Sequence, residues 1–282
     1  MEEDSFHRGQ RAGRTVFLIL LALLLIVRFP FLTIVSMLTP KPPWINSAFV
    51  YLTYLLTGIT IWWERDNLKR YFFGSETVAL FILAPFLEPA LAVPLRRMPW
   101  RYYKFRWFEM AVAVALLVAL LSVRWRFPRP DKRVMTWVAM GAGAGIAFGA
   151  INGYLQKVYQ PMVIPPGVQL SPASFRALAA AFVTQFTRAA TLEEPVLRGF
   201  LWGYLRDRKW SDLKITILQV VLFWLGHFYY FPKLPVSFWF TVPAAAALLS
   251  LLLWRSRSVT STMVAHGFVN SMSDLVAHFR WR

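Results

Sequence analysis

Two adjacent glutamates and an arginine lie inside one of the longest apolar stretches of the sequence. Residues 191–206 read TLEEPVLRGFLWGYLR and place Glu193, Glu194 and Arg198 among aliphatic and aromatic side chains. Charged side chains are costly in apolar, membrane-like surroundings, so they are usually functional or paired with one another. The search for chemistry therefore begins in this stretch.

Helical spacing gives the two glutamates different expected roles. Glu194 and Arg198 are four residues apart on one helix face, which favours an ion pair with the acid before the base. Glu193 lies about 100° away around the helix and is expected to lack such a partner. Apolar surroundings disfavour the charged form of a carboxyl group, and a carboxyl that exchanges a proton near neutral pH can act as a general base or acid. The alternative is a buried salt-bridge cluster that only locks helices together.

Two of the four histidines lie in later apolar stretches. His227 follows Phe223 by four residues and His266 precedes Asn270 by four, so each pair shares one helix face. His266 and Asn270 can both donate hydrogen bonds to a common point. A single histidine in such a segment is most often a packed residue. Two histidines, an asparagine and Glu193 on three successive segments indicate a shared site.

The composition indicates which class of protein holds these residues. Of 282 residues, 57% are hydrophobic and 16% are charged, which is more apolar surface than a soluble core of this size can hide. The net charge of +17 comes mostly from short Lys and Arg clusters between apolar runs. That pattern is typical of loops at lipid headgroups and argues against nucleic acid as a partner. The absence of cysteine excludes disulfides and thiolate chemistry.

The predicted fold is an all-α, polytopic transmembrane bundle with eight or nine membrane segments. The candidate segments are residues 16–38, 47–63, 77–93, 108–123, 134–155, 173–204, 213–231, 236–254 and 259–279. Several are shorter than the about 20 residues that a helix needs to cross a bilayer. Arg28 interrupts the first segment without an evident reason. The predicted organisation is a polar cytoplasmic tail (1–15), an N-terminal transmembrane scaffold (16–158) and a catalytic helical core (173–282).

The basic loops predict that this multi-pass protein has its N-terminus in the cytoplasm. The compactness of the chain is typical of a prokaryotic protein, so the expected location is a prokaryotic plasma membrane. The clusters then placed inside are Arg65, Lys69 and Arg70; Arg124, Arg126, Arg129, Lys132 and Arg133; Arg206, Arg208 and Lys209; and Arg255 and Arg257. One loop disagrees, and it carries Arg96, Arg97, Arg101, Lys104 and Arg106. The proline-containing segment 77–93 is therefore a candidate re-entrant loop, which would reverse the topology on one side of it.

Glycines recur every four residues in the segment 134–155, at Gly141, Gly145, Gly149 and Gly153. Four residues advance a helix by about 400°, so these positions form a ridge without side chains. Such ridges let two helices approach closely. We expect this ridge to pack against another helix of the same chain and not against a second copy.

Three motifs, taken in order, resemble the CPBP or ABI family of glutamic intramembrane proteases, which includes the type II CAAX prenyl endopeptidases. They are Glu-Glu-x-x-x-Arg at 193–198, Phe-x-x-x-His at 223–227 and His-x-x-x-Asn at 266–270, within a resemblance that covers about 175–274. Two features depart from the family: Pro195 follows the glutamates, and alanines replace common glycines in 243–254. Neither departure changes a proposed catalytic group.

The resemblance implies an endopeptidase that needs no cofactor and cleaves a membrane-protein or lipidated-protein substrate in the lipid bilayer. Glu193, assisted by His227, would activate a water to attack the scissile amide. His266 and Asn270 would form the oxyanion hole. Three side chains would support them: Glu194, Arg198 and Phe223.

Competing chemistries leave different signatures. The sequence has no His-Glu-x-x-His, Gly-x-Gly-Asp or Gly-x-Ser motif. Zinc bound by Glu193, His227 and His266 is a minor alternative, because carboxylate and imidazole are zinc ligands. The alternatives from other classes are a non-catalytic immunity or scaffold protein of the same family and a transporter. Glu88 is the best residue for transport, but paired broken helices and an internal repeat are not evident.

Overall fold

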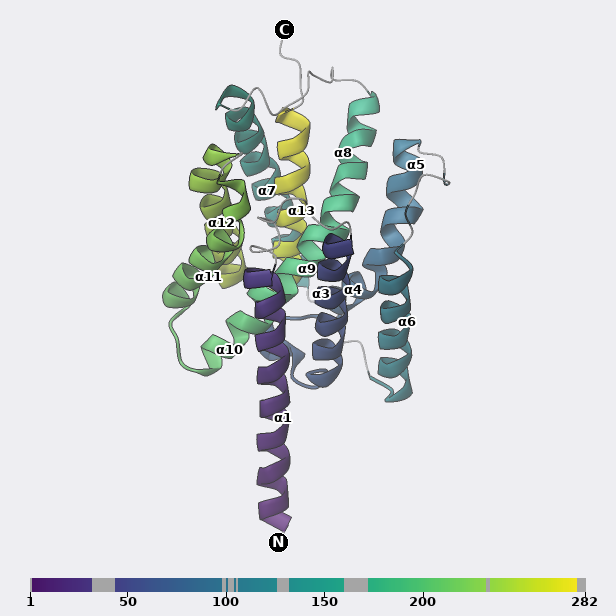
Figure 1. Cartoon of the computed structure of the whole chain (residues 1–282), viewed down its shortest axis with the longest axis vertical. Coiled ribbons are helices and arrows are strands. Elements are labelled where there is room, and N and C mark those ends of the chain that lie inside the picture. The colour runs from purple at the N-terminus through teal and green to yellow at the C-terminus, as the bar shows by residue number, and fades with distance from the viewer. Residues whose placement is uncertain are drawn as a thin grey trace.

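The structure is a computed structural model that describes residues 2–31, 44–97, 100, 104, 106–125, 132–159, 172–231 and 234–277. Every regular element in these residues is a helix, which confirms the all-α class (Figure 1). The elements are α1 (Glu2–Ile26), η1 (Val27–Phe31), α3 (Trp44–Trp63), η2 (Leu68–Tyr71), α4 (Ser75–Leu87), η3 (Glu88–Ala92), α5 (Val93–Arg96), α6 (Trp107–Ser122), α7 (Lys132–Tyr159), α8 (Pro172–Gln185), η6 (Phe186–Ala190), α9 (Thr191–Glu194), η7 (Pro195–Leu201), α10 (Trp202–Asp207), α11 (Asp212–Gly226), η8 (Phe228–Tyr230), η9 (Ser237–Thr241), α12 (Val242–Ser256) and α13 (Val259–Ala277).

Prolines widen the helices locally without ending them. The run from α4 through η3 to α5 is π-helical at η3, which contains Pro89. The run from α8 to α10 is π-helical at η6, which contains no proline, and again at η7, which begins at Pro195. A proline cannot donate to the carbonyl four residues earlier, and a π-turn changes the pairing at that point. The stretch with the two glutamates is therefore one helix with a widened turn directly after Glu194.

Three helical runs among the described residues are long and apolar enough to cross a membrane by length and composition: Ser75–Arg96, Lys132–Tyr159 and Ser237–Ser256. Two shorter apolar helices are Ser47–Trp63 and Trp107–Ser122. The predicted number of eight or nine membrane segments is not established by these helices. The continuous run Ser75–Arg96 is long enough to span, which favours a crossing over the re-entrant alternative for 77–93.

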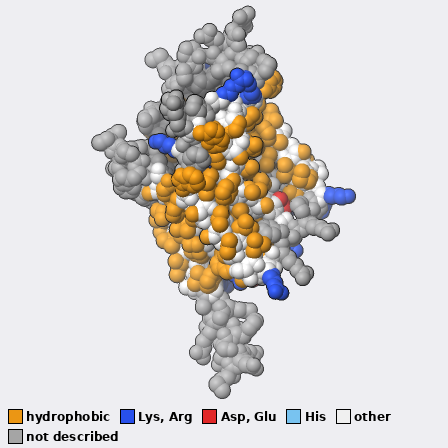
Figure 2. Space-filling view, turned by 90° about the vertical axis from the view of Figure 1, so that its right-hand side faces the viewer, with side chains coloured by type: hydrophobic (Ala, Val, Ile, Leu, Met, Phe, Trp, Pro, Cys, Tyr) orange, Lys and Arg blue, Asp and Glu red, His pale blue; other side chains and the backbone are white. Residues whose placement is uncertain are grey.

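The outer surface is strongly apolar. Large hydrophobic side chains such as Trp107, Phe175 and Phe240 are each more than two-thirds exposed. Figure 2 shows hydrophobic side chains over much of one face, with Lys and Arg side chains near its margins. An apolar surface of this extent is suited to contact with lipid.

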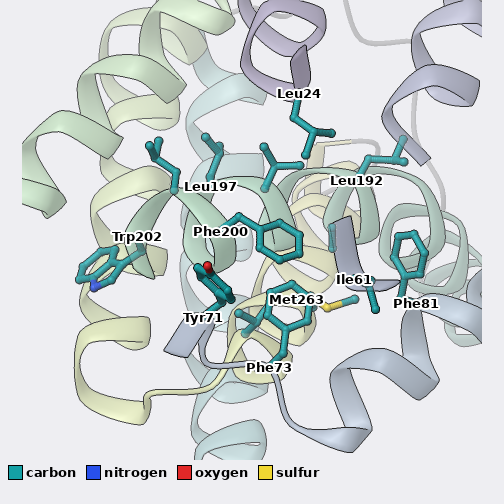
Figure 3. Packing of buried hydrophobic residues seen from close by; sticks show 14 of the residues in the cluster. Leu24, Ile61, Tyr71, Phe73, Phe81, Leu192, Leu197, Phe200, Trp202 and Met263 are labelled. Atoms are coloured by element: carbon teal, nitrogen blue, oxygen red, sulfur yellow. The ribbon is translucent and has the colours of Figure 1, made fainter. Parts of the chain in front are cut away.

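One hydrophobic core joins the N-terminal segments to the later helices (Figure 3). The rings of Tyr71 and Phe73, from the loop after α3, lie 5.3 and 4.8 Å from the ring of Phe200 in η7. Gly199 and Gly203 make room for this contact, because an added Cβ would overlap Phe73 or Tyr71. The helix that carries the two glutamates is therefore supported directly by the loop after α3.

The glycine ridge of α7 packs against α13. Each glycine faces a carbonyl oxygen of α13, in the pairs Gly141 with Ser261, Gly145 with Ala265, Gly149 with Val269 and Gly153 with Ser273. An added Cβ would lie 2.5 to 2.7 Å from these oxygens, closer than real Cβ atoms approach. Both series advance in the same direction, so the two helices are parallel. The prediction that the ridge packs within the chain is confirmed, and it fixes the helix that carries His266 and Asn270.

The N-terminal helix and four loops meet at one end of the bundle. Four contacts join them: Val259 N to the Phe72 carbonyl at 3.1 Å, Trp125 Nε1 to the Arg65 carbonyl at 3.2 Å, Arg257 to Asp212 at 2.7 Å, and Trp63 Nε1 to the Gly13 carbonyl at 3.1 Å. The loops follow α3, α6, α10 and α12, and they carry the clusters predicted to be cytoplasmic. We call this end the basic end.

We expect Gly149→Ala to displace α13 and to lower the free energy of unfolding by about 1–3 kcal/mol, as overpacking of a close contact does. Gly143→Ala is the matched control, because a Cβ at Gly143 meets nothing within 4 Å. Alanine also favours a helix over glycine, so the control is expected to unfold no earlier than the wild type. Unfolding of the purified variants in mild detergent measures both effects. Equal unfolding midpoints for the two variants would contradict the close α7–α13 contact.

Candidate active site

The residues singled out from the sequence come from three separate parts of the fold. Glu193 and Glu194 end α9 and are buried in front of the π-turn of η7. His227 lies at the C-terminus of α11, where the chain leaves the helix with φ −101° and ψ 18°. His266 and Asn270 lie one turn apart on α13.

These residues share one cavity. Glu193, His227, His266 and Asn270 all line a cavity of about 260 Å³, together with Phe223. The further lining residues include aliphatic side chains such as Val242 and Leu249, and polar or aromatic ones, namely Asn152, Gln156, Gln185, Tyr229, Tyr230 and Asp274. The three helix regions therefore meet at a single pocket with polar groups on several sides. Glu194 and Arg198 lie behind its wall.

The ion pair predicted between Glu194 and Arg198 is confirmed, with Arg198 Nη1 3.3 Å from Glu194 Oε1. Both residues are fully buried. Glu194 Oε1 also lies 2.8 Å from Nδ1 of His266, and Arg198 Nη2 donates to the Ala246 carbonyl at 3.4 Å. The pair therefore ties the glutamate helix to α13 and α12. This geometry fits a supporting role.

Glu193 does have an ion-pair partner, so the expectation that it lacks one was wrong. Arg28 Nη2 lies 2.6 Å from Glu193 Oε1, and both side chains are buried. Spacing within one helix could not show this, because Arg28 belongs to η1 at the end of the first segment. The pair also explains the arginine that interrupts that segment. Glu193 Oε2 has no hydrogen-bond partner among the described residues.

His227 is held in one orientation by its own helix. Its Nδ1 lies 2.7 Å from the Phe223 carbonyl, and its ring lies 4.5 Å from the Phe223 ring. A carbonyl oxygen can only accept, so Nδ1 carries a proton, and in the neutral ring Nε2 keeps its lone pair. Phe223 also contacts Arg198, whose guanidinium lies 4.7 Å from the ring centre. Phe223 thus positions both the histidine and the supporting arginine.

His266 and Asn270 face the cavity, but each already has a partner. Nδ1 of His266 is directed at Glu194, and Asn270 Nδ2 donates to Gln185 Oε1 at 3.2 Å. The remaining nitrogen of His266 is Nε2, and the amide of Asn270 has a second N–H. An acceptor atom bound by both residues would have to accept from Nε2 of His266 and from the second N–H of Asn270.

The structure does not form the zinc ligand set that the sequence left open. No three His, Asp or Glu side chains in the described part of the chain are grouped as ligands of one metal ion. Glu193 is instead engaged by a cation, Arg28.

Sequence reasoning missed three polar side chains around this pocket. Arg28 pairs with Glu193, and Gln185 accepts from Asn270. Gln219, fully buried on α11, donates to the Leu197 carbonyl inside the π-turn of η7. Gln219 was detectable in principle, since it is a lone polar residue in an apolar run, four positions before Phe223 on the same helix face.

Comparison with known families agrees with the three motifs. Residues 175–272, roughly a third of the chain, match a family model described as type II CAAX prenyl endopeptidase Rce1-like. The matched region is Rce1-like. This confirms the resemblance and supports, at the level of the family, a membrane protein that hydrolyses peptide bonds. No curated protein and no solved structure matches the chain.

The Rce1-like region holds the motif residues but not everything that contacts them. Arg28 and the glycine ridge of α7 both precede residue 175. The N-terminal segments therefore supply a charge and a packing surface to the pocket.

Arg28→Met should leave Glu193 charged, buried and without a partner. Breaking a buried pair in this way typically costs about 3–5 kcal/mol, so we expect a large loss of stability. Adding Glu193→Gln should recover most of that loss, because the orphaned charge is then gone. Unfolding of the two single variants and the double variant in detergent completes a double-mutant cycle.

Arg257→Met is the control for this cycle. It breaks a pair of similar length, 2.7 Å, in a partly exposed position at the basic end. Exposed pairs contribute about 0–1 kcal/mol, so this variant should remain close to the wild type. If the double variant lost as much stability as the two single variants lose together, the Arg28–Glu193 pair would not be coupled.

Proposed function

We propose that the chain is an intramembrane glutamic endopeptidase that hydrolyses a peptide bond of a membrane-associated or C-terminally anchored protein. The observation that carries this proposal is the single cavity lined by Glu193, His227, His266 and Asn270. The match of residues 175–272 to a protease family supports the same class of reaction. The residue roles below are part of the proposal.

Glu193 is the general base in this mechanism. Its Oε1 is held by Arg28 and its Oε2 has no partner in the part of the chain that the structure describes, so the second oxygen can accept a proton from a water in the cavity. The resulting hydroxide adds to the carbonyl carbon of the scissile amide. The C–N bond then breaks, and the leaving amine takes up a proton. His227 can relay to the amine, through Nε2, the proton that Glu193 took from the water, because its Nδ1 is fixed on the Phe223 carbonyl.

His266 and Asn270 stabilise the oxyanion of the tetrahedral intermediate. They lie one helical turn apart on α13 and line the same cavity as Glu193. Donors that are held in place before the reaction stabilise developing charge without reorganisation. Glu194 holds His266 and Gln185 holds Asn270, so both donors are preorganised.

The proposed enzyme is a multi-pass protein of the prokaryotic plasma membrane with eight or nine membrane segments and a cytoplasmic N-terminus. The apolar outer surface and the long apolar helices support contact with the bilayer. The gathering of Lys and Arg clusters at the basic end supports the orientation. The proposed substrate is another membrane-associated or lipidated protein.

Glu193→Gln and His227→Ala should each abolish cleavage per amount of folded protein. The amount of each variant in the membrane is measured in parallel, because Glu193→Gln leaves Arg28 buried without its carboxylate. Asn270→Ala should reduce the rate by about 10²- to 10³-fold, which is the usual cost of losing one oxyanion donor. Comparing the termini of membrane proteins from cells with wild-type and Glu193→Gln enzyme measures the activity and names the substrate.

Glu64→Gln is the control for a buried carboxylate outside the cavity. Glu64 is buried at the basic end, where it accepts a hydrogen bond from Tyr71 at 3.1 Å. This variant should cleave as the wild type does. Retention of the biological function in a Glu193→Gln, His227→Ala double variant would instead identify a non-catalytic scaffold or immunity protein.

A further inference from the structure

The cavity lies toward the end of the bundle opposite the basic end. Helix α13 starts at the basic end, where Val259 donates to the Phe72 carbonyl. At about 1.5 Å per residue, His266 lies about 10 Å along the helix from that start and Asp274 about 22 Å. Both residues line the cavity, which therefore extends from the middle of the bundle toward the C-terminal end of α13.

Other residues that line the cavity also lie toward the end opposite the basic end. Helix α7 is parallel to α13, and Asn152 and Gln156 line the cavity from its last two turns before Tyr159. Helix α11 starts near the basic end with Asp212, while His227, Tyr229 and Tyr230 follow its opposite end. The ends of α7 and α13 lie away from the N-terminus in Figure 1. We call this end the cavity end.

The distribution of charge indicates which end is cytoplasmic. The described basic residues in and beside the loops of the basic end are Arg65, Lys69, Arg70, Arg124, Arg206, Arg208, Lys209, Arg255 and Arg257. Cytoplasmic loops are enriched in Lys and Arg, so this end is expected to face the cytoplasm.

The loop between α5 and α6 lies at the cavity end, and its basic residues argue against a cytoplasmic basic end. The structure reduces the weight of this objection. Arg106 is not a solvated loop charge, because it is buried and lies 2.8 Å from Glu109 and 3.4 Å from Glu88. Glu88 also pairs with Arg188 at 2.8 Å. The carboxylates of Glu88 and Glu109 thus offset part of the positive charge there. Glu88, the best candidate for transport in the sequence, belongs to this ion-pair cluster. The other described basic residues at the cavity end are fewer than those at the basic end, and they are Arg96, Arg97, Lys104, Lys157 and Arg176.

We propose that the site is entered from the non-cytoplasmic face of the membrane and that its substrate is an extended peptide segment exposed at that face. The identity of the substrate as a peptide to be cleaved rests on the proposed function, whereas the side of entry rests on the fold and the charges. The outer part of the cavity suits a peptide backbone. Asn152, Gln156 and Gln185 offer amide donors and acceptors, and Asp274 adds a carboxylate.

The absence of cysteine makes the test direct, because a single introduced cysteine is the only thiol in the protein. Asp274→Cys reports on the cavity, Tyr159→Cys on the cavity end outside it, and Arg208→Cys on the basic end. All three positions are exposed. Each variant is combined with Glu193→Gln, expressed in the inner membrane of a bacterium and treated as intact spheroplasts with a membrane-impermeant maleimide.

We expect labelling of Asp274→Cys and Tyr159→Cys in intact spheroplasts and labelling of Arg208→Cys only after lysis. Labelling of Arg208→Cys in intact spheroplasts, with the other two requiring lysis, would overturn the inference by reversing the orientation. Labelling of Tyr159→Cys but not Asp274→Cys from outside would also overturn it, because the cavity would then not open at that face.

Failure of this inference is distinguishable from failure of the proposed function. Labelling needs no turnover, so its outcome decides the side of entry even in the inactive Glu193→Gln background. Cleavage of membrane proteins by the wild type but not by Glu193→Gln decides the proteolytic function separately. In a cleaving enzyme, the new termini should map to segments at the non-cytoplasmic face. New termini confined to cytoplasmic segments would overturn the inference.

Discussion

The structure depends on the neutralisation of two adjacent carboxylates inside an apolar bundle. A buried charge without a partner costs several kcal/mol, so Glu193 and Glu194 can be placed side by side only if cations reach both. Arg198 supplies one cation from the same helix, at 3.3 Å from Glu194. Arg28 supplies the other from the first segment, at 2.6 Å from Glu193. The charge balance of the site is therefore a property of the assembled bundle and not of one helix.

The local backbone follows from this requirement. Pro195 comes directly after the two glutamates, and the helix continues from it as a π-turn over Pro195–Leu201. A π-turn leaves carbonyls displaced from their usual donors, and Gln219 from α11 donates to the Leu197 carbonyl at this point. Gly199 then lets Phe73 pack against the same turn. The charged residues thus sit on a backbone that is itself held by neighbouring segments.

Sequence alone predicted the features that depend on spacing within one helix. The Glu194–Arg198 pair, the shared face of His266 and Asn270, and the glycine ridge of α7 all follow from a fixed number of residues per turn. The partner of Glu193 could not be predicted in this way, because Arg28 is brought to it by the packing of helices far apart in sequence. The same reason applies to Gln185, which contacts Asn270 across α8 and α13. The number of membrane segments could not be predicted from the pattern of apolar runs either, since several of these runs are shorter than a bilayer requires.

The Rce1-like region is consequently incomplete as a physical unit, although it contains every motif residue. Without η1, Glu193 would be a buried carboxylate with no counter-ion, and without α7 the backbone of α13 would lose the surface against which its carbonyls lie. The larger hydrophobic core points to the same dependence, because it combines Phe17 and Leu24 of α1 with Leu197 and Phe200 of η7 and Met263 of α13. The opposite charges of Arg28 and Glu193 come from distant segments. The pocket can therefore assemble only when the first segment has met the later helices. The segments before residue 175 therefore belong to the candidate site as well as to its scaffold.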